Sequence, residues 1–214
     1  SLYTPQTLSG SSLKTMGESS DFTLIRFNDQ VPTFYQPFFS GWDIRGTAPL
    51  NTVCIHHPDG NKKKISVDND PAISYEDTIS LVGGSVTPPG PHWEVAFDDG
   101  STYSGSSGGP LFDESRRITG QLHGGRTMDY FGKLSYSWEY PKPNYLPLQL
   151  FLDPDSTGVT YNDGYYPPDN LPDAKFLSEF RAVCVDSPVE LTGFSAFDPL
   201  AWQWSFYPSN VIYH

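Results

Sequence analysis

The sequence has 214 residues, of which 18 % are charged and 15 % aromatic, with 19 glycines, 20 prolines and a formal net charge of −12. A surface this negative repels phosphate backbones and anionic lipid, so we expect no nucleic-acid partner and no membrane-surface partner. No apolar run approaches the ~20 residues of a membrane-spanning helix, so we expect no membrane span. Low charge with many aromatic, glycine and proline residues argues against a helical bundle and favours short strands joined by tight turns.

Partial alternation of apolar and polar side chains predicts strands along the first part of the chain. We expect these strands at residues 22–27, 52–56, 64–67, 92–97, 117–122 and 133–138. Turn-forming sequences such as His57-Pro-Asp-Gly60 separate them, and one short helix is expected over residues 145–152. Strands without alternating helices indicate an all-β fold, either a barrel or a sandwich.

The composition changes between Val159 and Asp173 to Tyr, Asp, Asn, Gly and Pro, which is typical of a linker. Strand alternation then resumes at residues 174–176, 181–185, 189–192 and 202–206. About 40 residues are too few for a complete sandwich, so we expect only the first part of a second domain. Cys54 and Cys184 fall in different predicted domains; they pair with each other, pair outside this chain, or stay free.

The sharpest chemical motif is Gly105-Ser-Ser-Gly-Gly-Pro110. A serine nucleophile needs a sharply turned backbone that exposes its hydroxyl and points two N–H groups at the substrate carbonyl oxygen. Ser107 is the central hydroxyl, and the N–H groups of Gly105 and Ser107 are candidates for the oxyanion hole. The alternative is an ordinary Gly/Ser-rich hairpin loop.

Asp21 begins the apolar strand Asp21-Phe-Thr-Leu-Ile25. An aspartate that orients a catalytic imidazole must be held in a half-buried position of this kind. The alternative is an ordinary aspartate at the edge of a strand. Together with the serine loop, in the chain order Asp then Ser, it predicts two members of a catalytic triad.

The order of six motifs resembles that of the lysyl endopeptidase family, which are trypsin-fold serine proteases secreted by bacteria. The resemblance covers residues 6–164 and implies a trypsin-like double β-barrel. The motifs are Asp21-Phe-Thr-Leu-Ile25, Phe39-Ser-Gly-Trp42, Ile55-His-His-Pro-Asp-Gly60, Lys63-Lys-Ile-Ser66, Gly105-Ser-Ser-Gly-Gly-Pro110 and Gly120-Gln-Leu-His-Gly-Gly125.

The resemblance implies roles for individual residues. Ser107 matches the nucleophile, Asp21 the triad aspartate and Gly105 the oxyanion-hole position. Asp129, in Asp129-Tyr-Phe-Gly132, matches the carboxylate that pairs with the substrate lysine at the bottom of the primary pocket. His123 matches a histidine beside that pocket, and a structural, hydrogen-bonded histidine is the alternative. The implied substrates are proteins or peptides that contain lysine, and the implied location is extracellular.

The chain departs from the family pattern at the general base. In this fold the triad runs His, Asp, Ser, and no histidine precedes His56. His56 and His57 match a His-His-Pro turn of the family, which is not where its base resides. We therefore expect a preceding segment, which can remain associated as a separate N-terminal fragment, to supply the histidine. We expect the isolated chain to be inactive. The alternative is a catalytically inert protease-fold fragment that serves as a binding, adhesion or structural module of a larger secreted protein.

Two further features complete the prediction. The acidic loops Asp68-Asn-Asp70 and Asp153-Pro-Asp155 carry carboxylates suited to calcium but lack a recognisable ligand spacing, so we expect no cofactor. The tail, at residues 174–176, 188–192 and 202–206, resembles the first half of a PKD domain, an immunoglobulin-like β-sandwich. The expected layout is a trypsin-like domain lacking its N-terminal segment (1–165), a linker (166–172) and the PKD-like half-domain (173–214).

Overall fold

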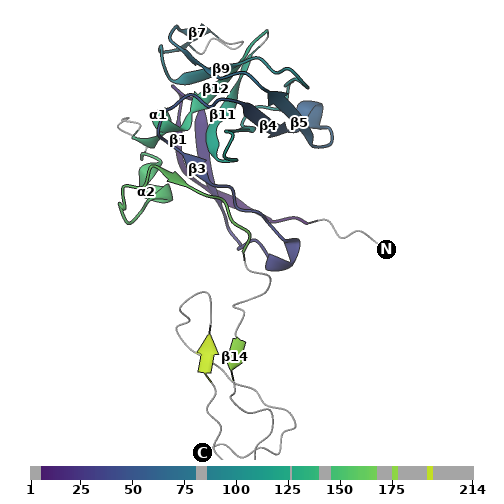
Figure 1. The fold of residues 1–214 in the computed structure, drawn as a ribbon, viewed down its shortest axis with the longest axis vertical. Helices are drawn as coiled ribbons and strands as arrows, with labels where there is room; N and C mark the ends of the chain where they lie inside the picture. The colour runs from purple at the N-terminus through teal and green to yellow at the C-terminus, as the bar shows by residue number, and fades with distance from the viewer. Residues whose placement is uncertain are drawn as a thin grey trace, which may run out of the picture. The chain divides into compact units, whose positions relative to one another are not determined.

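A computed structural model describes residues 6–80, 86–125, 127–139, 146–167, 175–177 and 192–194. The chain divides into two compact units, residues 1–30 with 38–165, and residues 31–37 with 166–214. The first unit is mostly β-sheet with few short helices (Figure 1), which agrees with the expected all-β class.

The central sheet of the first unit is antiparallel along the order β5-β4-β10-β11-β12-β9-β6. At one end of β11, β3 pairs with it in parallel, and β13 extends β3. The bounds are β3 Trp42–Asp43, β4 Thr52–His56, β5 Lys64–Asp68, β6 Ile73–Tyr75, β9 His92–Val95, β10 Pro110–Phe112, β11 Ile118–Gly125, β12 Asp129–Lys133 and β13 Tyr161–Asn162.

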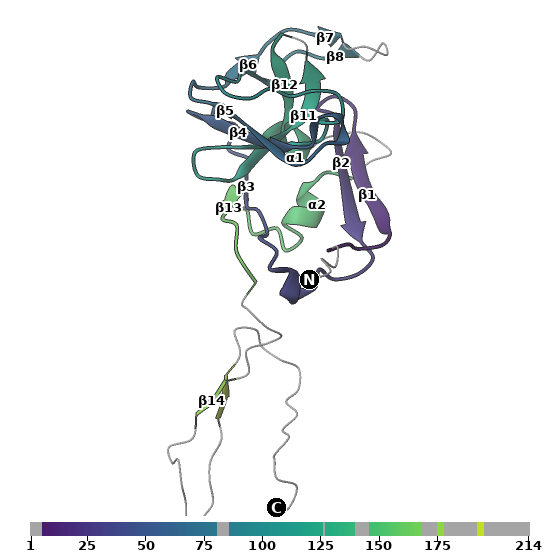
Figure 2. The same cartoon turned by 90° about the vertical axis from the view of Figure 1, so that its right-hand side faces the viewer.

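Two smaller strand pairs accompany this sheet. β1 (Ser11–Gly17) and β2 (Phe22–Phe27) form an antiparallel hairpin closed by residues 18–21, and Figure 2 shows the hairpin at one side of the unit. β7 (Ile79–Ser80) pairs with β8 (Val86–Thr87). A 3₁₀ turn, η2 (Pro58–Gly60), lies between β4 and β5.

The core of the sheet is a cross-strand row of large apolar side chains. Phe131 on β12 pairs with Leu122 on β11 and with Trp93 on β9, and all three are buried. Cys54, a free thiol, and Leu111 lie in the same cluster. Burial of such side chains stabilises the fold by about 1.5–3 kcal/mol each. Trp93, at 2 % exposure, is thus a core residue.

A second apolar cluster, Phe22, Trp42, Leu134, Trp138 and Leu148, joins the hairpin to the helices. The Trp42 and Trp138 ring centroids are 4.7 Å apart. Phe22 is the first residue of β2, so this cluster anchors the strand that follows Asp21.

The strand predicted at 133–138 is wrong, because these residues form helix α1 (Leu134–Trp138) after β12 ends at Lys133. Leu134 and Trp138 are spaced for one face of a helix as well as for one face of a strand. The Ser137 hydroxyl donates to the Lys133 carbonyl oxygen at 3.0 Å, which closes a helical turn. The predicted helix at 145–152 is shorter than expected, as α2 spans Gln149–Leu152.

In the second unit the structure describes a 3₁₀ turn, η1 (Thr33–Tyr35), and an antiparallel pair of strands, β14 (Lys175–Leu177) and β15 (Thr192–Phe194). The predicted strands at 181–185 and 202–206, and Cys184, lie outside the described residues. The described part of the chain contains no helix with the length and hydropathy needed to cross a membrane.

Candidate active site

The loop before β10 presents Ser107 on a tightly turned backbone. Gly105 and Gly108 flank Ser106 and Ser107 with φ values of 89° and 80°, in the left-handed region that favours glycine. The Gly108 N–H donates to the Leu122 carbonyl at 2.8 Å, and the Leu122 N–H donates to the Gly109 carbonyl at 2.8 Å. These two bonds fix the loop to β11.

The two serines of this loop have opposite environments. Ser106 is buried, and its hydroxyl accepts from the Tyr103 N–H at 3.1 Å. Ser107 is exposed, and its hydroxyl bonds to none of the described residues. The N–H groups of Gly105 and Ser107 likewise have no hydrogen-bond partner within the described part of the chain. The loop therefore leaves one hydroxyl and two N–H groups available to a ligand.

His56 supports this loop from inside the sheet. Its Nδ1 lies 2.8 Å from the Ser106 hydroxyl and its Nε2 lies 3.0 Å from the Ser66 hydroxyl. Burial lowers the pKa of His56, which keeps the ring neutral. Because both ring nitrogens are already bonded, His56 is a structural histidine. His57 is exposed and hydrogen-bonds through Nδ1 to the Asn61 carbonyl at 3.0 Å.

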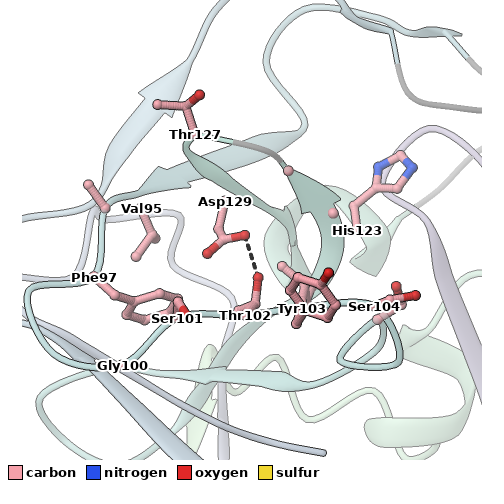
Figure 3. Close-up of a pocket in the computed structure, with 15 residues that line it drawn as sticks. Val95, Phe97, Gly100, Ser101, Thr102, Tyr103, Ser104, His123, Thr127 and Asp129 are labelled. Carbon is pink, nitrogen blue, oxygen red and sulfur yellow. Dashed lines mark hydrogen bonds between the residues drawn. The ribbon is translucent and has the colours of Figure 1, made fainter. Parts of the chain in front are cut away.

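A cavity of about 760 Å³ opens beside the loop and is lined by Ser107, His123 and Asp129. Figure 3 labels His123 and Asp129 among its lining residues. Asp129 begins β12, and its Oδ1 accepts from the Thr102 hydroxyl at 2.6 Å. Burial raises the pKa of the Asp129 carboxyl, and the hydrogen bond from Thr102 opposes this rise. The cavity therefore combines a serine hydroxyl with a partly desolvated carboxylate.

His123 reaches this cavity because of a β-bulge. On β11, Leu122 pairs with Phe131 and Gly124 with Tyr130, which leaves His123 as the extra residue. An extra residue of this kind re-aims its side chain, and bulges are over-represented next to active sites. The His123 Nε2 points to the Asp21 carboxylate, with 3.6 Å between Nε2 and Oδ2.

Asp21 is held by its neighbour Ser20. The Ser20 hydroxyl is hydrogen-bonded to the Ser137 hydroxyl at 2.8 Å, and the Ser20 carbonyl accepts from the Gln121 side-chain amide at 2.8 Å. A Cβ added at Gly132 would lie 1.8 Å from that carbonyl oxygen, so only glycine on β12 allows the turn to lie this close. The Asp21 side chain itself is 52 % exposed, which is more than the half-buried position expected from the sequence.

His92 also belongs to this group, although no sequence pattern indicated it. Its Nε2 lies 2.9 Å from the Nδ1 of His123, and the residue is 1 % exposed. Burial, with smaller contributions from His123 and Lys133, lowers the pKa of His92 to about 3. The contact is made across strands, between β9 and the bulge of β11, so no spacing along the chain could have predicted it.

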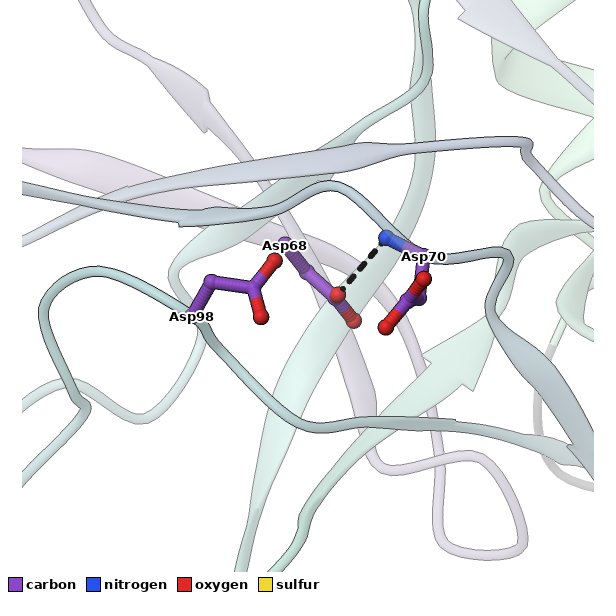
Figure 4. Close-up of side chains that lie close together, drawn as sticks. All are labelled: Asp68, Asp70 and Asp98. Atoms are coloured by element: carbon purple, nitrogen blue, oxygen red, sulfur yellow. Dashed lines mark hydrogen bonds between the residues drawn. The ribbon is translucent and has the colours of Figure 1, made fainter.

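Three aspartates gather at another place, where carboxylate oxygens of Asp68, Asp70 and Asp98 lie within 4.8 Å of one another (Figure 4). The buried Asp68 carboxylate accepts from the Asp70 N–H at 3.0 Å and the Ala96 N–H at 3.3 Å. These bonds close the loop after β5, so the geometry by itself assigns no metal to the cluster. In the other acidic loop, Asp153 accepts from the Thr157 and Gly158 N–H groups.

Comparison with known protein families shows one to which this chain is related. The model of the family described as lysyl endopeptidase, C-terminal domain, matches residues 2–133, which is more than half of the sequence. The chain belongs to that family. Ser107, Asp21, His123 and Asp129 all lie within the matched region. The family match makes this a protease-related domain.

Solved structures with partial similarity to this lysyl endopeptidase family member include three of the Rv3671c protease. They are a serine-to-alanine mutant from M. tuberculosis in its inactive form (17 % identity, TM-score 0.36), the protease in its inactive form (18 %, 0.37) and the M. tuberculosis protease in its active form (16 %, 0.38). Each match covers 57 % of this chain and, in that order, 58 %, 60 % and 53 % of the other. The chain thus spans little more than half the length of these structures, and its family membership rests on the sequence match.

Proposed function

We propose that this chain is the nucleophile-bearing part of a secreted serine endopeptidase that cleaves after lysine. The observation that carries the proposal is that Ser107 and Asp129 line the same cavity. In the proposed reaction the Ser107 Oγ attacks the backbone carbonyl carbon of the substrate lysine. The N–H groups of Gly105 and Ser107 hydrogen-bond to the oxyanion that forms.

The environment of Asp129 supports lysine as the residue in the cavity. Its pKa is raised because burial disfavours the carboxylate. A substrate ammonium would offset that cost, since each charge compensates the lost hydration of the other. Val95 and Phe97 line the same cavity and offer apolar contacts to the methylene chain of lysine.

The general base of this mechanism is a histidine outside the chain. In our proposal Asp21 orients that imidazole, which accepts the Ser107 proton and returns it to the leaving amine. The four described histidines are His56, His57, His92 and His123, and none hydrogen-bonds to the Ser107 hydroxyl. The 52 % exposure of the Asp21 side chain leaves room for a further group to approach it. The isolated chain is then inactive.

The wider proposal concerns the parent protein. We propose a trypsin-like double β-barrel over residues 1–165, a linker over 166–172 and the first half of a PKD-like sandwich over 173–214. We also propose that the protein is bacterial and extracellular, acts on protein or peptide substrates with lysine, associates with its own N-terminal fragment and needs no cofactor. The family membership and the all-β first unit support this layout.

A second candidate function is a catalytically inert protease-fold module that serves binding, adhesion or assembly in a larger secreted protein. The hydrogen bonding of the four described histidines favours it, because none of them is bonded to the Ser107 hydroxyl. A parent protein without a triad histidine before Asp21 would support this candidate over the peptidase.

The test is hydrolysis of a lysyl ester by the full-length parent protein. We expect Ser107→Ala to abolish hydrolysis, with a loss of kcat on the order of 10⁶-fold. Asp129→Ser should remove the preference for lysyl over alanyl esters. Ser104→Ala, an exposed serine of the same cavity, is the matched control and should retain activity. Unchanged rates in both active-site variants would refute the proposal.

A further inference from the structure

A row of three polar side chains runs inward from Asp21 through His123 to His92. The Asp21 Oδ2 lies 3.6 Å from the His123 Nε2, and the His123 Nδ1 lies 2.9 Å from the His92 Nε2. Exposure falls along the row, from 52 % for the Asp21 side chain to 7 % for His123 and 1 % for the His92 residue. The row is therefore open to solvent at Asp21 and closed to it at His92.

We propose that His92 is a positioning residue, which donates its Nε2–H to His123 and thereby fixes His123 in the tautomer that presents Nε2–H to Asp21. The proposal rests on the proposed function in one respect, namely that Asp21 is the triad carboxylate. The assignment of the tautomer itself follows from the contacts of the two imidazoles.

Both imidazoles are neutral, because burial lowers the pKa of each of them. The positive charge of Lys133, and of His123 when protonated, further disfavours a proton on His92. The Asp21 carboxylate acts in the opposite direction on His123, but less strongly than burial does. A neutral imidazole carries one N–H donor and one acceptor nitrogen, so in each ring the proton is on either Nδ1 or Nε2.

In the first arrangement the His92 Nε2–H donates to the His123 Nδ1. His123 then carries its proton on Nε2 and points an N–H at the Asp21 carboxylate, an acceptor. The buried His92 Nδ1, which has no hydrogen-bond partner among the described residues, is left as an acceptor nitrogen.

In the second arrangement the His123 Nδ1–H donates to the His92 Nε2. The acceptor Nε2 of His123 then faces the negative Asp21 carboxylate, which is repulsive. The His92 Nδ1 becomes a buried N–H without an acceptor in the described part of the chain, which is unfavourable. Both differences favour the first arrangement.

The backbone makes the row rigid. His92 on β9 pairs directly with Gly132 on β12, and the Ser20 carbonyl lies against the same Gly132. The bulge that turns His123 toward Asp21 lies on β11, which is the other strand that pairs with β12. The three side chains are therefore held around one glycine of the sheet, as preorganised sites require.

The consequence is a fixed carboxylate. The Nε2–H of His123 faces Oδ2 at 3.6 Å, so Oδ2 is turned toward His123 and Oδ1 is left to orient the triad imidazole. Loss of the His92 donor should free His123 to turn or change tautomer. We expect the effect in the full-length protein on kcat rather than KM, because neither residue contacts the lysine side chain.

The test is ¹⁵N NMR of histidine-labelled chain, in which the nitrogen shifts distinguish Nδ1–H from Nε2–H. We expect His123 to be in the Nε2–H form in the unmodified chain. His92→Phe should change the His123 tautomer or its shifts, and His92→Gln should restore them, because its amide N–H can occupy the place of Nε2–H. A His123 that carries its proton on Nδ1 in the unmodified chain would overturn the proposal, even if His92→Phe does not fold. So would a His92→Phe spectrum without change.

Kinetics of the full-length protein separates this proposal from the proposed function. We expect His92→Phe to lower kcat roughly 10- to 100-fold with little change in KM, and His92→Gln to recover most of the loss. A full-length protein that lacks peptidase activity but shows the expected tautomer would overturn the function and support the assignment of the His123 tautomer. Full kcat in a folded His92→Phe enzyme would overturn the positioning role and leave the peptidase assignment intact.

Discussion

The Nδ1 of His56 lies 2.8 Å from the hydroxyl of Ser106, the residue directly before the candidate nucleophile Ser107. The other ring nitrogen of His56 is bonded to Ser66 on β5, so one imidazole ties the loop to the interior of the sheet. Replacement of His56 by alanine leaves the buried hydroxyls of Ser66 and Ser106 without this partner. We expect a loss of about 2–4 kcal/mol in the free energy of unfolding, measured by urea denaturation.

The control for this prediction is His57→Ala, which removes an exposed histidine with a single bond to the Asn61 carbonyl. We expect it to cost less than about 1 kcal/mol. Equal effects of the two substitutions would mean that His56 does not support the loop.

The Thr102 hydroxyl affects the pKa of Asp129, the carboxylate of the cavity. Its hydroxyl donates to Asp129 at 2.6 Å and opposes the upward shift that burial causes in the pKa of Asp129. Thr102→Val keeps the shape and removes the donor, so the pKa of Asp129 should rise further. Butylamine, a mimic of the lysine side chain, should bind several-fold more weakly to the variant at about pH 5, because more of the Asp129 carboxyl is then protonated. The difference should vanish at about pH 8, and calorimetry measures both affinities.

Thr127→Val is the matched control, because Thr127 lines the same cavity without a hydrogen bond to Asp129. It should follow the unmodified chain at every pH. A Thr102→Val chain that also follows the unmodified chain would show that the hydroxyl does not affect the ionisation of Asp129.

Gly132 allows the turn that carries Asp21 to approach the sheet. A Cβ at this position would lie 1.8 Å from the Ser20 carbonyl oxygen and 2.4 Å from the Gln121 side-chain nitrogen. We expect Gly132→Ala to cost about 2–4 kcal/mol of unfolding free energy, because backbone must move. Gly60→Ala, at φ 65° with nothing within 4 Å, isolates backbone strain and should cost about 1 kcal/mol. The reverse ranking in urea denaturation would contradict the packing described here.

The buried His92 makes the chain less stable in acid. Its pKa falls from 6.5 to about 3 on folding, so between these values the unfolded chain binds more protons than the folded chain. The free energy of unfolding therefore decreases as the pH falls below 6.5. From pH 7 to pH 5 the unmodified chain should lose about 2 kcal/mol more than His92→Gln, which cannot titrate.

Urea denaturation at the two pH values measures this difference, because titrating groups that do not interact with His92 contribute equally to both chains. His57→Gln, which replaces an exposed histidine, controls for the chemical change. Parallel pH profiles for the unmodified chain and His92→Gln would contradict the burial of a neutral His92.

Sequence patterns predicted the elements in which local signals agree with tertiary packing. The expected bounds of β2 and β4 are confirmed to the residue, because their turns and alternation coincide. The strand predicted at 133–138 is wrong because Leu134 and Trp138 fit both periodicities, and only the contacts with Phe22 and Trp42 decide between them.

Some residues of the candidate site could likewise be predicted from the sequence, and others could not. Ser107 and its flanking glycines are local features, and Asp129 became a candidate through family resemblance. The bulge at His123 and the contact with His92 depend on the register between β11, β12 and β9, which the spacing of residues along one strand does not specify. The roles of Ser107, Asp21, Gly105, Asp129 and His123 in catalysis stay predictions until activity is measured.

The central claim is that Ser107 is a nucleophile whose cavity selects lysine through Asp129. Its most direct test is mass spectrometry of the full-length protein after reaction with a fluorophosphonate that carries a lysine-like amine, with an uncharged analogue as the control. We predict one adduct on the Ser107 hydroxyl, and loss of labelling by the amine probe but not by the uncharged probe in Asp129→Asn. An adduct on a different serine, or equal labelling of Asp129→Asn by both probes relative to the unmodified protein, would contradict the account.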